Sequence, residues 1–209
     1  MAQSEGKTIE TVLLIDTCGA AGSVALFRAG LLVAKSVLAD RSASVLLLSA
    51  VSGVLSGVRQ PDAVTVVNGP GSFTGVRVGL SAAKALAEAW NVPLFAVSRL
   101  EVLGEGSATG LAVMDAGRGQ LYVRDLATGM ESLEDRATVL EHIAESALPV
   151  VAEAALAATL PNAAVREVHV GDAWSAVQRA IERGAEDIAL LDANYVRSES
   201  DIYGARKSA

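Results

Sequence analysis

Cysteine, histidine and aromatic side chains are scarce in this sequence of 209 residues. It has one cysteine, Cys18, and two histidines, His142 and His169, and aromatic residues make up 4%. A single cysteine excludes an internal disulfide framework and is typical of a reducing compartment. Neither histidine has a partner at the spacing of a zinc-hydrolase motif such as H-E-x-x-H, and neither lies in a recognisable protease motif. The sequence therefore argues against a protease.

Positive charge is also in short supply. The chain has 17 lysines and arginines against 24 acidic residues, a formal net charge of -7. Affinity for nucleic acid comes largely from Lys and Arg on phosphates, so the chain is a poor candidate for holding RNA by itself. The basic residues Arg197, Arg206 and Lys207 near the end form either a local RNA contact or, as we favour, solvated tail charge.

Long apolar runs are missing as well. No segment approaches the length of a membrane span, and the first residues, MAQSEGKTIE, lack the basic-then-apolar pattern of a signal peptide. We therefore expect a cytoplasmic protein with no membrane contact.

What the sequence does contain is an alternation of apolar strand-like and helix-like segments, which indicates an α/β fold. The elements expected in the first half are a strand over 10–16, an antiparallel meander over 23–40 turning at Ala29-Gly30, a helix over 42–58, a strand over 63–68, a helix over 75–90 and a strand over 93–98. The alternation continues through the second half.

The second half begins like the first. LAVMDAGRGQLYVRDL at 111–126 follows the outline of LLIDTCGAAGSVALF at 13–27, and Asp115 occupies the place of Asp16. This repeat predicts a duplicated domain with two lobes, flanking a compact linker, GEGSATG. We divide the chain into an N-terminal lobe over 1–104 and a smaller C-terminal lobe over 105–209, with its last residues candidates for packing back on the first lobe.

A glycine-rich turn, NGPGSFTG, joins the strand at 63–68 to the helix at 75–90. It lacks the lysine of a P-loop and the glycine spacing of a dinucleotide fingerprint, so we do not expect a dedicated phosphate site. An anion site at the helix start is one interpretation, and a tight, capped strand-to-helix turn is the one we favour. The turn residues are Gly69, Pro70, Gly71, Ser72 and Thr74, and either hydroxyl residue is a candidate cap.

The two helices of the first half have unusual surfaces. Polar residues of the helix at 75–90 fall on one narrow stripe, and the other positions are apolar or small. The helix at 42–58 sets an apolar face, with Leu47, Leu48 and Val51, opposite a small-residue face, with Ser49 and Ser52. The pattern favours two interpretations equally: a pair packed between the sheet and a partner protein, or a pair enclosed in its own core.

The segments LLIDTCGAAGSVALF, GPGSFTGVRVGLSAAKALA, DAGRGQLYV and YVR together resemble the TsaB (YeaZ) family over nearly the whole chain. The resemblance implies an actin-like (ASKHA, ribonuclease H-like) duplicated fold with two lobes of mixed sheets flanked by helices. It also implies a role in making threonylcarbamoyladenosine beside the anticodon of certain tRNAs.

In that family, TsaB is the partner without catalytic residues. The resemblance implies a heterodimer with TsaD, which carries the nucleotide and metal site, a ternary complex with the ATPase TsaE, and a functional link to TsaC. ATP or ADP and metal are thus expected on partner subunits and none on the isolated chain, and tRNA is met only through the complex.

The interface implied by the resemblance lies on the two helices. One departure from the family is Ala43, which stands in Asp40-Arg41-Ser42-Ala43-Ser44 where relatives often have histidine. The change puts in doubt a polar contact at that point of the interface. The expected interface residues are Val45, Ser49, Ser52, Ser56, Gly75, Arg77, Val78, Gly79, Ala82, Ala83 and Leu86.

Two rival functions remain. An actin-like ATP-dependent phosphotransferase would use Asp16 and Asp115 to hold a hydrated Mg²⁺, although each aspartate can instead cap its own turn. We expect no tight ATP binding by the isolated chain. The second rival is a homodimer without an enzyme partner, which would form through the same helices in the absence of TsaD.

Overall fold

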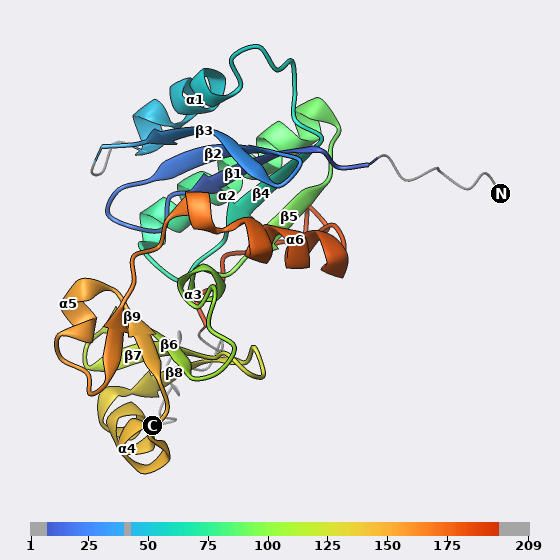
Figure 1. Cartoon of the computed structure of the whole chain (residues 1–209). Helices are drawn as coiled ribbons and strands as arrows, with labels where there is room; N and C mark the ends of the chain where they lie inside the picture. Colours follow the sequence, from blue (N-terminus) through green and yellow to red (C-terminus); the bar gives the residue numbers. More distant parts are fainter. Residues whose placement is uncertain (1–7, 40–42, 197–209) are drawn as a thin grey trace, which may run out of the picture.

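The computed structural model describes residues 8–39 and 43–196, which form two lobes placed one above the other (Figure 1). Each lobe contains a five-stranded mixed sheet flanked by helices. A short helix, Arg99–Leu103 (α3), lies where the lobes meet and carries the chain from the first sheet to the second. Within the described residues, no helix is long and apolar enough to cross a membrane.

The first sheet contains the strands Thr11–Asp16 (β1), Ser23–Arg28 (β2), Leu31–Val37 (β3), Ala63–Val67 (β4) and Leu94–Val97 (β5). Their order is β3-β2-β1-β4-β5. The first three strands form the predicted antiparallel meander, whereas β4 and β5 run parallel to β1. Because helices cover both faces of the sheet, β4 and β5 are buried along their whole length, which explains their unbroken apolar sequences.

The second sheet contains the strands Leu111–Gly117 (β6), Gln120–Asp125 (β7), Glu131–Asp135 (β8), Val150–Ala152 (β9) and Ala163–Val165 (β10). Its order, β10-β9-β6-β7-β8, repeats the first sheet strand for strand. The strands β6, β7 and β8 are again antiparallel, and β9 and β10 are again parallel to β6. The predicted duplication is therefore confirmed.

Two long helices, Ala43–Val54 (α1) and Phe73–Trp90 (α2), cover one face of the first sheet. Helix α1 packs on β2 and β3, and α2 packs on β1, β4 and β5. Both predicted boundaries need correction. Helix α1 ends four residues before the predicted position 58, ahead of a turn in which Gly57 has a φ of 80°. Helix α2 begins two residues earlier than predicted, at Phe73.

The opposite face of the first sheet is covered by elements that follow the second sheet in the sequence. A 3₁₀ turn, Val170–Asp172 (η1), and a helix, Trp174–Arg183 (α6), bury Val177 and its neighbours against β2, β4 and β5. The division that we predicted, between residues 104 and 105, assigns these two elements to the second lobe. Their core contacts are with the first lobe. The helices of the second sheet are Arg136–Ser146 (α4) and Ala154–Ala157 (α5).

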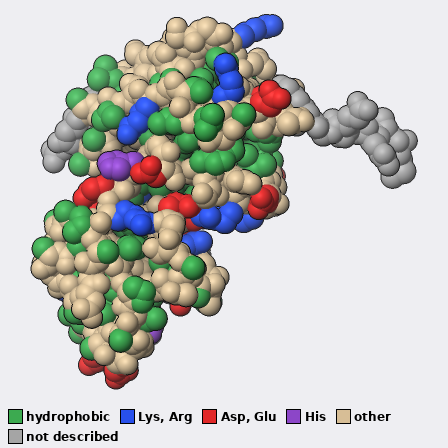
Figure 2. All heavy atoms as spheres, in the orientation of Figure 1, with side chains coloured by type: hydrophobic (Ala, Val, Ile, Leu, Met, Phe, Trp, Pro, Cys, Tyr) green, Lys and Arg blue, Asp and Glu red, His purple; other side chains and the backbone are tan. Residues whose placement is uncertain are grey.

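An ion-pair cluster fixes α6 to the connecting helix α3. The carboxylate of Glu101, only 5% exposed, accepts a hydrogen bond from Arg179 Nε at 2.9 Å and lies 3.4 Å from Arg183 Nη1. Arg179 also pairs with Glu105. Because a buried carboxylate is costly unless it is paired, these arginines hold the returning helix in one position at the junction of the lobes. Figure 2 shows acidic and basic side chains meeting along this junction.

Gly75 provides a test of how closely α2 approaches the sheet. Its backbone is helical, without a positive φ, and an added Cβ would collide with the carbonyl oxygen of Thr17. We expect Gly75→Ala to lower the free energy of unfolding by about 3 kcal/mol, measured by urea denaturation. Gly53→Ala on α1, where a Cβ meets nothing within 4 Å, should instead raise it by about 0.5 kcal/mol. Equal effects of both changes would contradict the close approach.

Candidate functional site

The glycine-rich turn is held against the end of β1 and against the segment around Asn194. Gly69 has a φ of 119° and precedes a cis peptide bond to Pro70. A Cβ on Gly69 would collide with the carbonyl oxygen of Asn194, and a Cβ on Gly71 would collide with that of Cys18. Both glycines are therefore needed because backbone from another segment lies directly against them.

The turn also builds the start of α2. Ser72 is the N-cap, and its hydroxyl oxygen accepts a hydrogen bond from the backbone N–H of Gly75 at 3.3 Å. Thr74, the other candidate cap, is exposed within the helix. The hydroxyl of Thr17 donates to the carbonyl oxygen of Gly75 at 2.6 Å, and the backbone N–H of Ser72 donates to Cys18 O at 2.8 Å. These contacts are the ones expected of a tight, capped strand-to-helix turn.

Helices α1 and α2 leave an apolar surface facing away from the sheet. On α1, Val45 is 78% exposed, Leu48 64% and Leu46 41%. Leu48 is thus exposed, whereas Leu47 and Val51, which the sequence groups with it on one apolar face, are buried. We call the surface the helix-pair face and define it by the exposed or half-buried side chains of Val45, Leu46, Leu48, Val78, Ala82, Ala85 and Leu86.

Most predicted interface residues lie on this side of the helices, and two do not. Gly79 is buried, and a Cβ there would collide with the Thr17 hydroxyl oxygen; Ala83 is fully buried in the core beneath α2. Both face the sheet because α2 lies almost in contact with it. The other predicted interface residues are exposed or half-buried: Val45, Ser49, Ser52, Ser56, Gly75, Arg77, Val78, Ala82 and Leu86.

Asp16 and Asp115 occupy equivalent places in the two lobes and make equivalent hydrogen bonds. Asp16 Oδ1 accepts a hydrogen bond from the N–H of Cys18, and Asp115 Oδ1 accepts one from the N–H of Gly117, both at 2.8 Å. Each carboxylate therefore caps the turn that follows its own strand. Asp16 is 5% exposed and Asp115 is exposed. Within the described residues, no group of three or more His, Cys, Asp or Glu side chains is placed to hold a metal.

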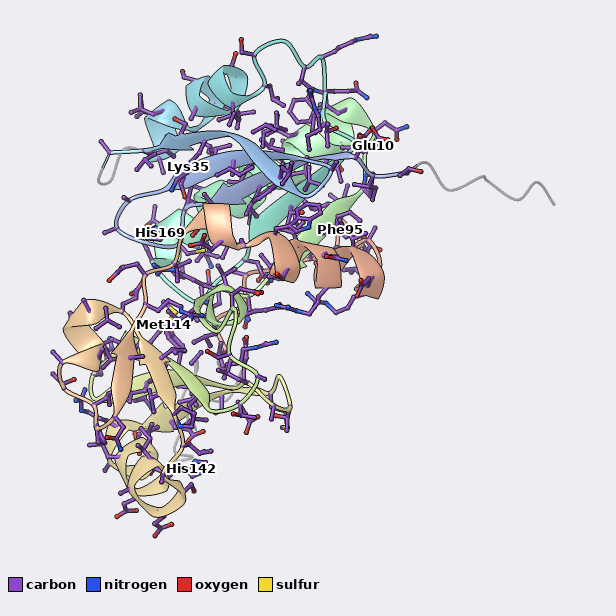
Figure 3. All side chains as sticks on the ribbon, in the orientation of Figure 1. Glu10, Lys35, Phe95, Met114, His142 and His169 are labelled. Atoms are coloured by element: carbon purple, nitrogen blue, oxygen red, sulfur yellow. The ribbon has the colours of Figure 1, made fainter. Side chains whose placement is uncertain are left out.

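A cleft of about 760 Å³ lies between the lobes. The first lobe contributes the turn after β1 and the start of α2, and the second contributes Met114, Asp115, Tyr122 and Glu153. Met114, labelled in Figure 3, lies where the second lobe meets the first. Arg99 crosses the cleft, with its Nη2 2.7 Å from Glu153 Oε1. Among the described residues that line the cleft, the charged side chains are one guanidinium and two carboxylates.

The two histidines lie apart from this cleft and from each other. His142 is on α4 in the second lobe, and His169 precedes η1 beneath the first sheet (Figure 3). Both are exposed. Neither is placed to act as a base toward Cys18, whose Sγ donates to the carbonyl oxygen of Val67 at 3.1 Å. The arrangement does not support nucleophilic catalysis at the one cysteine.

Comparison with known proteins identifies the family. A family model described as "TsaD: tRNA N6-adenosine threonylcarbamoyltransferase" matches residues 38–191. The chain is 36% identical over 121 residues to the tRNA threonylcarbamoyladenosine biosynthesis protein TsaB of Bacillus subtilis, and 38% identical over 121 residues to that of Escherichia coli. The chain belongs to the TsaD family, in its TsaB (YeaZ) branch.

The extent of these matches differs between sequence and structure. The two TsaB alignments cover 54% and 53% of this chain, and the chain spans about half the length of each relative, 53% and 52%. A crystal structure from Pseudomonas aeruginosa, described as an uncharacterized protein with similarity to peptidase YEAZ, matches with a TM-score of 0.73 at 27% identity. That match covers 90% of this chain and all of the other. The fold is the two-lobed actin-like (ASKHA) fold that the TsaB resemblance implied.

Sequence reasoning missed several residues of the site. Leu46, Leu48 and Ala85 complete the helix-pair face, and Arg99 and Glu153 bridge the cleft. The exposure of Leu48 follows from its place on the helical wheel beside Ser52 and Val45, so a stricter wheel would have found it. The Arg99–Glu153 pair joins residues of different lobes, so no local sequence pattern predicts it.

The thiol of Cys18 provides a pH test of this part of the fold. Burial, and secondarily the nearby Asp16 carboxylate, raises the pKa of the thiol well above its usual value, whereas Arg99 acts in the opposite sense. The folded chain therefore keeps a proton that the unfolded chain releases above about pH 8.5. The stability that the protonated Cys18 thiol contributes is fully present below that pH and is lost as the pH rises above it. Between pH 8 and 9.5 the free energy of unfolding should fall by about 1 kcal/mol more than in Cys18→Ala.

The two chains are compared by urea denaturation at matched ionic strength. Parallel pH profiles would show that the thiol has the same pKa in the folded and unfolded chains. In that case Cys18 would not be buried beneath the turn.

Proposed function

We propose that this chain is a non-catalytic partner of a TsaD subunit in the biosynthesis of tRNA threonylcarbamoyladenosine, and that it docks through the helix-pair face. The names of its TsaB relatives and of the matching family model support this pathway. The chain serves as a dimerisation scaffold and activator, while the transfer reaction belongs to the partner.

The observation that carries the proposal is the exposure of the helix-pair face. Val45 and Leu48 lie one turn apart on α1 and leave most of their apolar surface in water. Helix α1 has no charged residue at all, and its other exposed positions are mostly serine and glycine. An ordinary surface helix covers its outer side with charged residues. A smooth apolar surface without charges is suited to close contact with another protein.

The occupant that we favour is a TsaD subunit, with a second copy of this chain as the substitute when TsaD is absent. An exposed apolar face of this kind associates with whatever complementary surface is available, and a two-fold pair of identical faces satisfies that condition. A TsaD heterodimer then competes with the homodimer. TsaE would join the heterodimer and TsaC would supply its activated substrate, so tRNA meets this chain only through the complex.

A supporting role, rather than catalysis, accounts for the remaining polar residues. Asp16 and Asp115 are engaged as caps of their own turns. In the cleft, the guanidinium of Arg99 is already paired with Glu153. ATP or ADP and metal are accordingly assigned to the partner subunits. Within the part of the chain that the structure describes, the cleft between the lobes favours the alternative, an actin-like phosphotransferase. The two carboxylates and one guanidinium among its described lining residues are unfavourable for a nucleotide without a metal.

Activation of TsaD would follow from differential binding. If this chain binds the active arrangement of TsaD more tightly than the inactive one, docking increases the population of the active arrangement. Reconstitution of tRNA modification with TsaC, TsaD and TsaE measures this contribution. Omission of this chain should abolish most of the activity.

Substitutions on the helix-pair face test the docking. Leu48→Arg and Ala85→Arg each place an unpaired charge where the partner would exclude water, without touching the core. Each should weaken binding to purified TsaD by about 3 kcal/mol, or roughly 100-fold in Kd, measured by titration calorimetry. Activity in the reconstituted reaction should fall in parallel.

The matched control is Gln178→Arg, which adds the same charge at an exposed position of α6 on the other side of the sheet. It should bind TsaD like the unchanged chain. Full-strength binding by Leu48→Arg and Ala85→Arg would show that the interface is elsewhere. Ala83→Arg is unsuitable as a test because Ala83 is buried in the chain's own core.

A further inference from the structure

The last described segment of the chain crosses from one side of the first lobe to the other. After α6, the backbone N–H of Glu186 donates to Leu94 O at 2.8 Å, along the free edge of β5. Ile188 and Leu191 then pack against the core beneath α1 and α2. The backbone N–H of Asn194 donates to Asn68 O at 2.7 Å, at the glycine-rich turn. The segment therefore delivers residue 195 to the first turn of α2.

Tyr195 joins two side chains of α2 there. Its ring stacks on that of Phe73, with centroids 5.7 Å apart and an interplanar angle of 20°. The guanidinium carbon of Arg77 lies 3.8 Å from the centroid of the Phe73 ring, and Arg77 Nε donates to the Tyr195 hydroxyl oxygen at 3.1 Å. We call these three side chains the aromatic–guanidinium anchor. Stacking, cation–π and hydrogen-bond contacts hold them as one unit.

The anchor extends the helix-pair face. On α2, the half-buried Val78, Ala82 and Leu86 lie on the side toward α1, where they pack against the core that the two helices share. At 100° per residue, Phe73 and Arg77 lie on the opposite edge of the exposed side of the same helix. The outer surface thus runs from α1 across α2 to Tyr195.

An internal clamp that only held the segment around Tyr195 in place would cover its aromatic rings. Phe73 instead remains 58% exposed although Tyr195 and Arg77 both touch it. An ordered Phe–Tyr–Arg group has little side-chain freedom left to lose on binding. Tyrosine and arginine are also among the residue types that carry most of the energy in protein interfaces.

The charge at this end of the surface indicates the chemistry of the partner. The chain as a whole has a net charge of -7, and α1 has no charged residue. The charged residues on the first two thirds of α2 are Arg77 and Lys84, and the helix's one acidic residue, Glu88, lies near its far end. A partner surface complementary to this end presents carboxylates beside apolar side chains.

We propose that the aromatic–guanidinium anchor is the specificity-determining part of the docking surface, and that it receives an acidic, partly apolar patch of the TsaD subunit. The inference rests on the proposed function. The segment after α6 therefore takes part in partner recognition, through Tyr195, as well as in covering the edge of β5.

The test is titration calorimetry of full-length variants with purified TsaD at two salt concentrations. Arg77→Gln should raise the Kd at least tenfold at low salt and reduce its salt dependence, because one cation facing carboxylates is lost. Tyr195→Ala should raise the Kd about tenfold. Tyr195→Phe, which keeps the stack and loses only the hydroxyl, should stay within threefold. Lys35→Gln removes an exposed cation from β3 and should leave binding unchanged.

The melting temperature of each variant separates recognition from stability. If Tyr195→Ala and Arg77→Gln bind within twofold of the unchanged chain while Leu48→Arg loses binding, the anchor is only an internal clamp and the inference fails, although the proposed docking stands. If Leu48→Arg also binds fully, the proposed function fails. If Tyr195→Ala does not fold, the binding of Arg77→Gln decides between the two outcomes, since Arg77 is exposed and its replacement removes no side chain from the hydrophobic core.

Discussion

Helix α2 lies directly against the end of β1, and the arrangement of the first lobe depends on this contact. Gly75 and Gly79 leave no side chain between the helix and Thr17, whose hydroxyl donates to the carbonyl oxygen of Gly75. The contact fixes which side of α2 is buried. Gly79, Ala83 and Ala87 face the sheet, so the apolar and cationic positions on the other side face outward. The glycine-rich turn and the Ser72 cap set the point at which the helix begins.

The two lobes share a topology and differ in what covers it. The first sheet has the 18-residue helix α2 after β4, and the second has the four-residue helix α5 after the equivalent strand β9. The repeated aspartate turns show that both lobes keep the same strand ends. A long helix with an apolar outer side exists only in the first lobe among the described residues. The duplication therefore accounts for the two sheets, whereas the proposed docking surface belongs to the first lobe alone among the described residues.

Much of the fold follows from the sequence. The meander turning at Ala29-Gly30, the capped glycine-rich turn and the duplicated strand order are all local or repeated patterns, and each is present in the structure. The return of α6 to the first sheet is not local, because its pairing with Glu101 joins segments about eighty residues apart. The predicted basic residues Arg197, Arg206 and Lys207, together with Asp40 to Ser42, lie outside the described residues.

The candidate site was predicted less completely, for a physical reason. Periodicity finds which residues lie on one side of a helix, but not how close the helix comes to the sheet, so Gly79 and Ala83 were assigned to the surface. The apolar stretch VLLL groups Leu48 with Leu47 on one apolar face, and only its position on the helical wheel beside Val45 and Ser52 separates the two. The anchor depends on Tyr195 arriving from a segment more than a hundred positions away, and a single sequence carries no signal for that contact.

Hydrogen–deuterium exchange of the chain, alone and saturated with TsaD, measures the docking surface without any substitution. The account predicts that partner binding slows exchange in residues 43–54, 73–89 and 192–196, and leaves α6 and the second sheet unchanged. Slowed exchange confined to α6 or to the second lobe, with α1 and α2 unaffected, would contradict it.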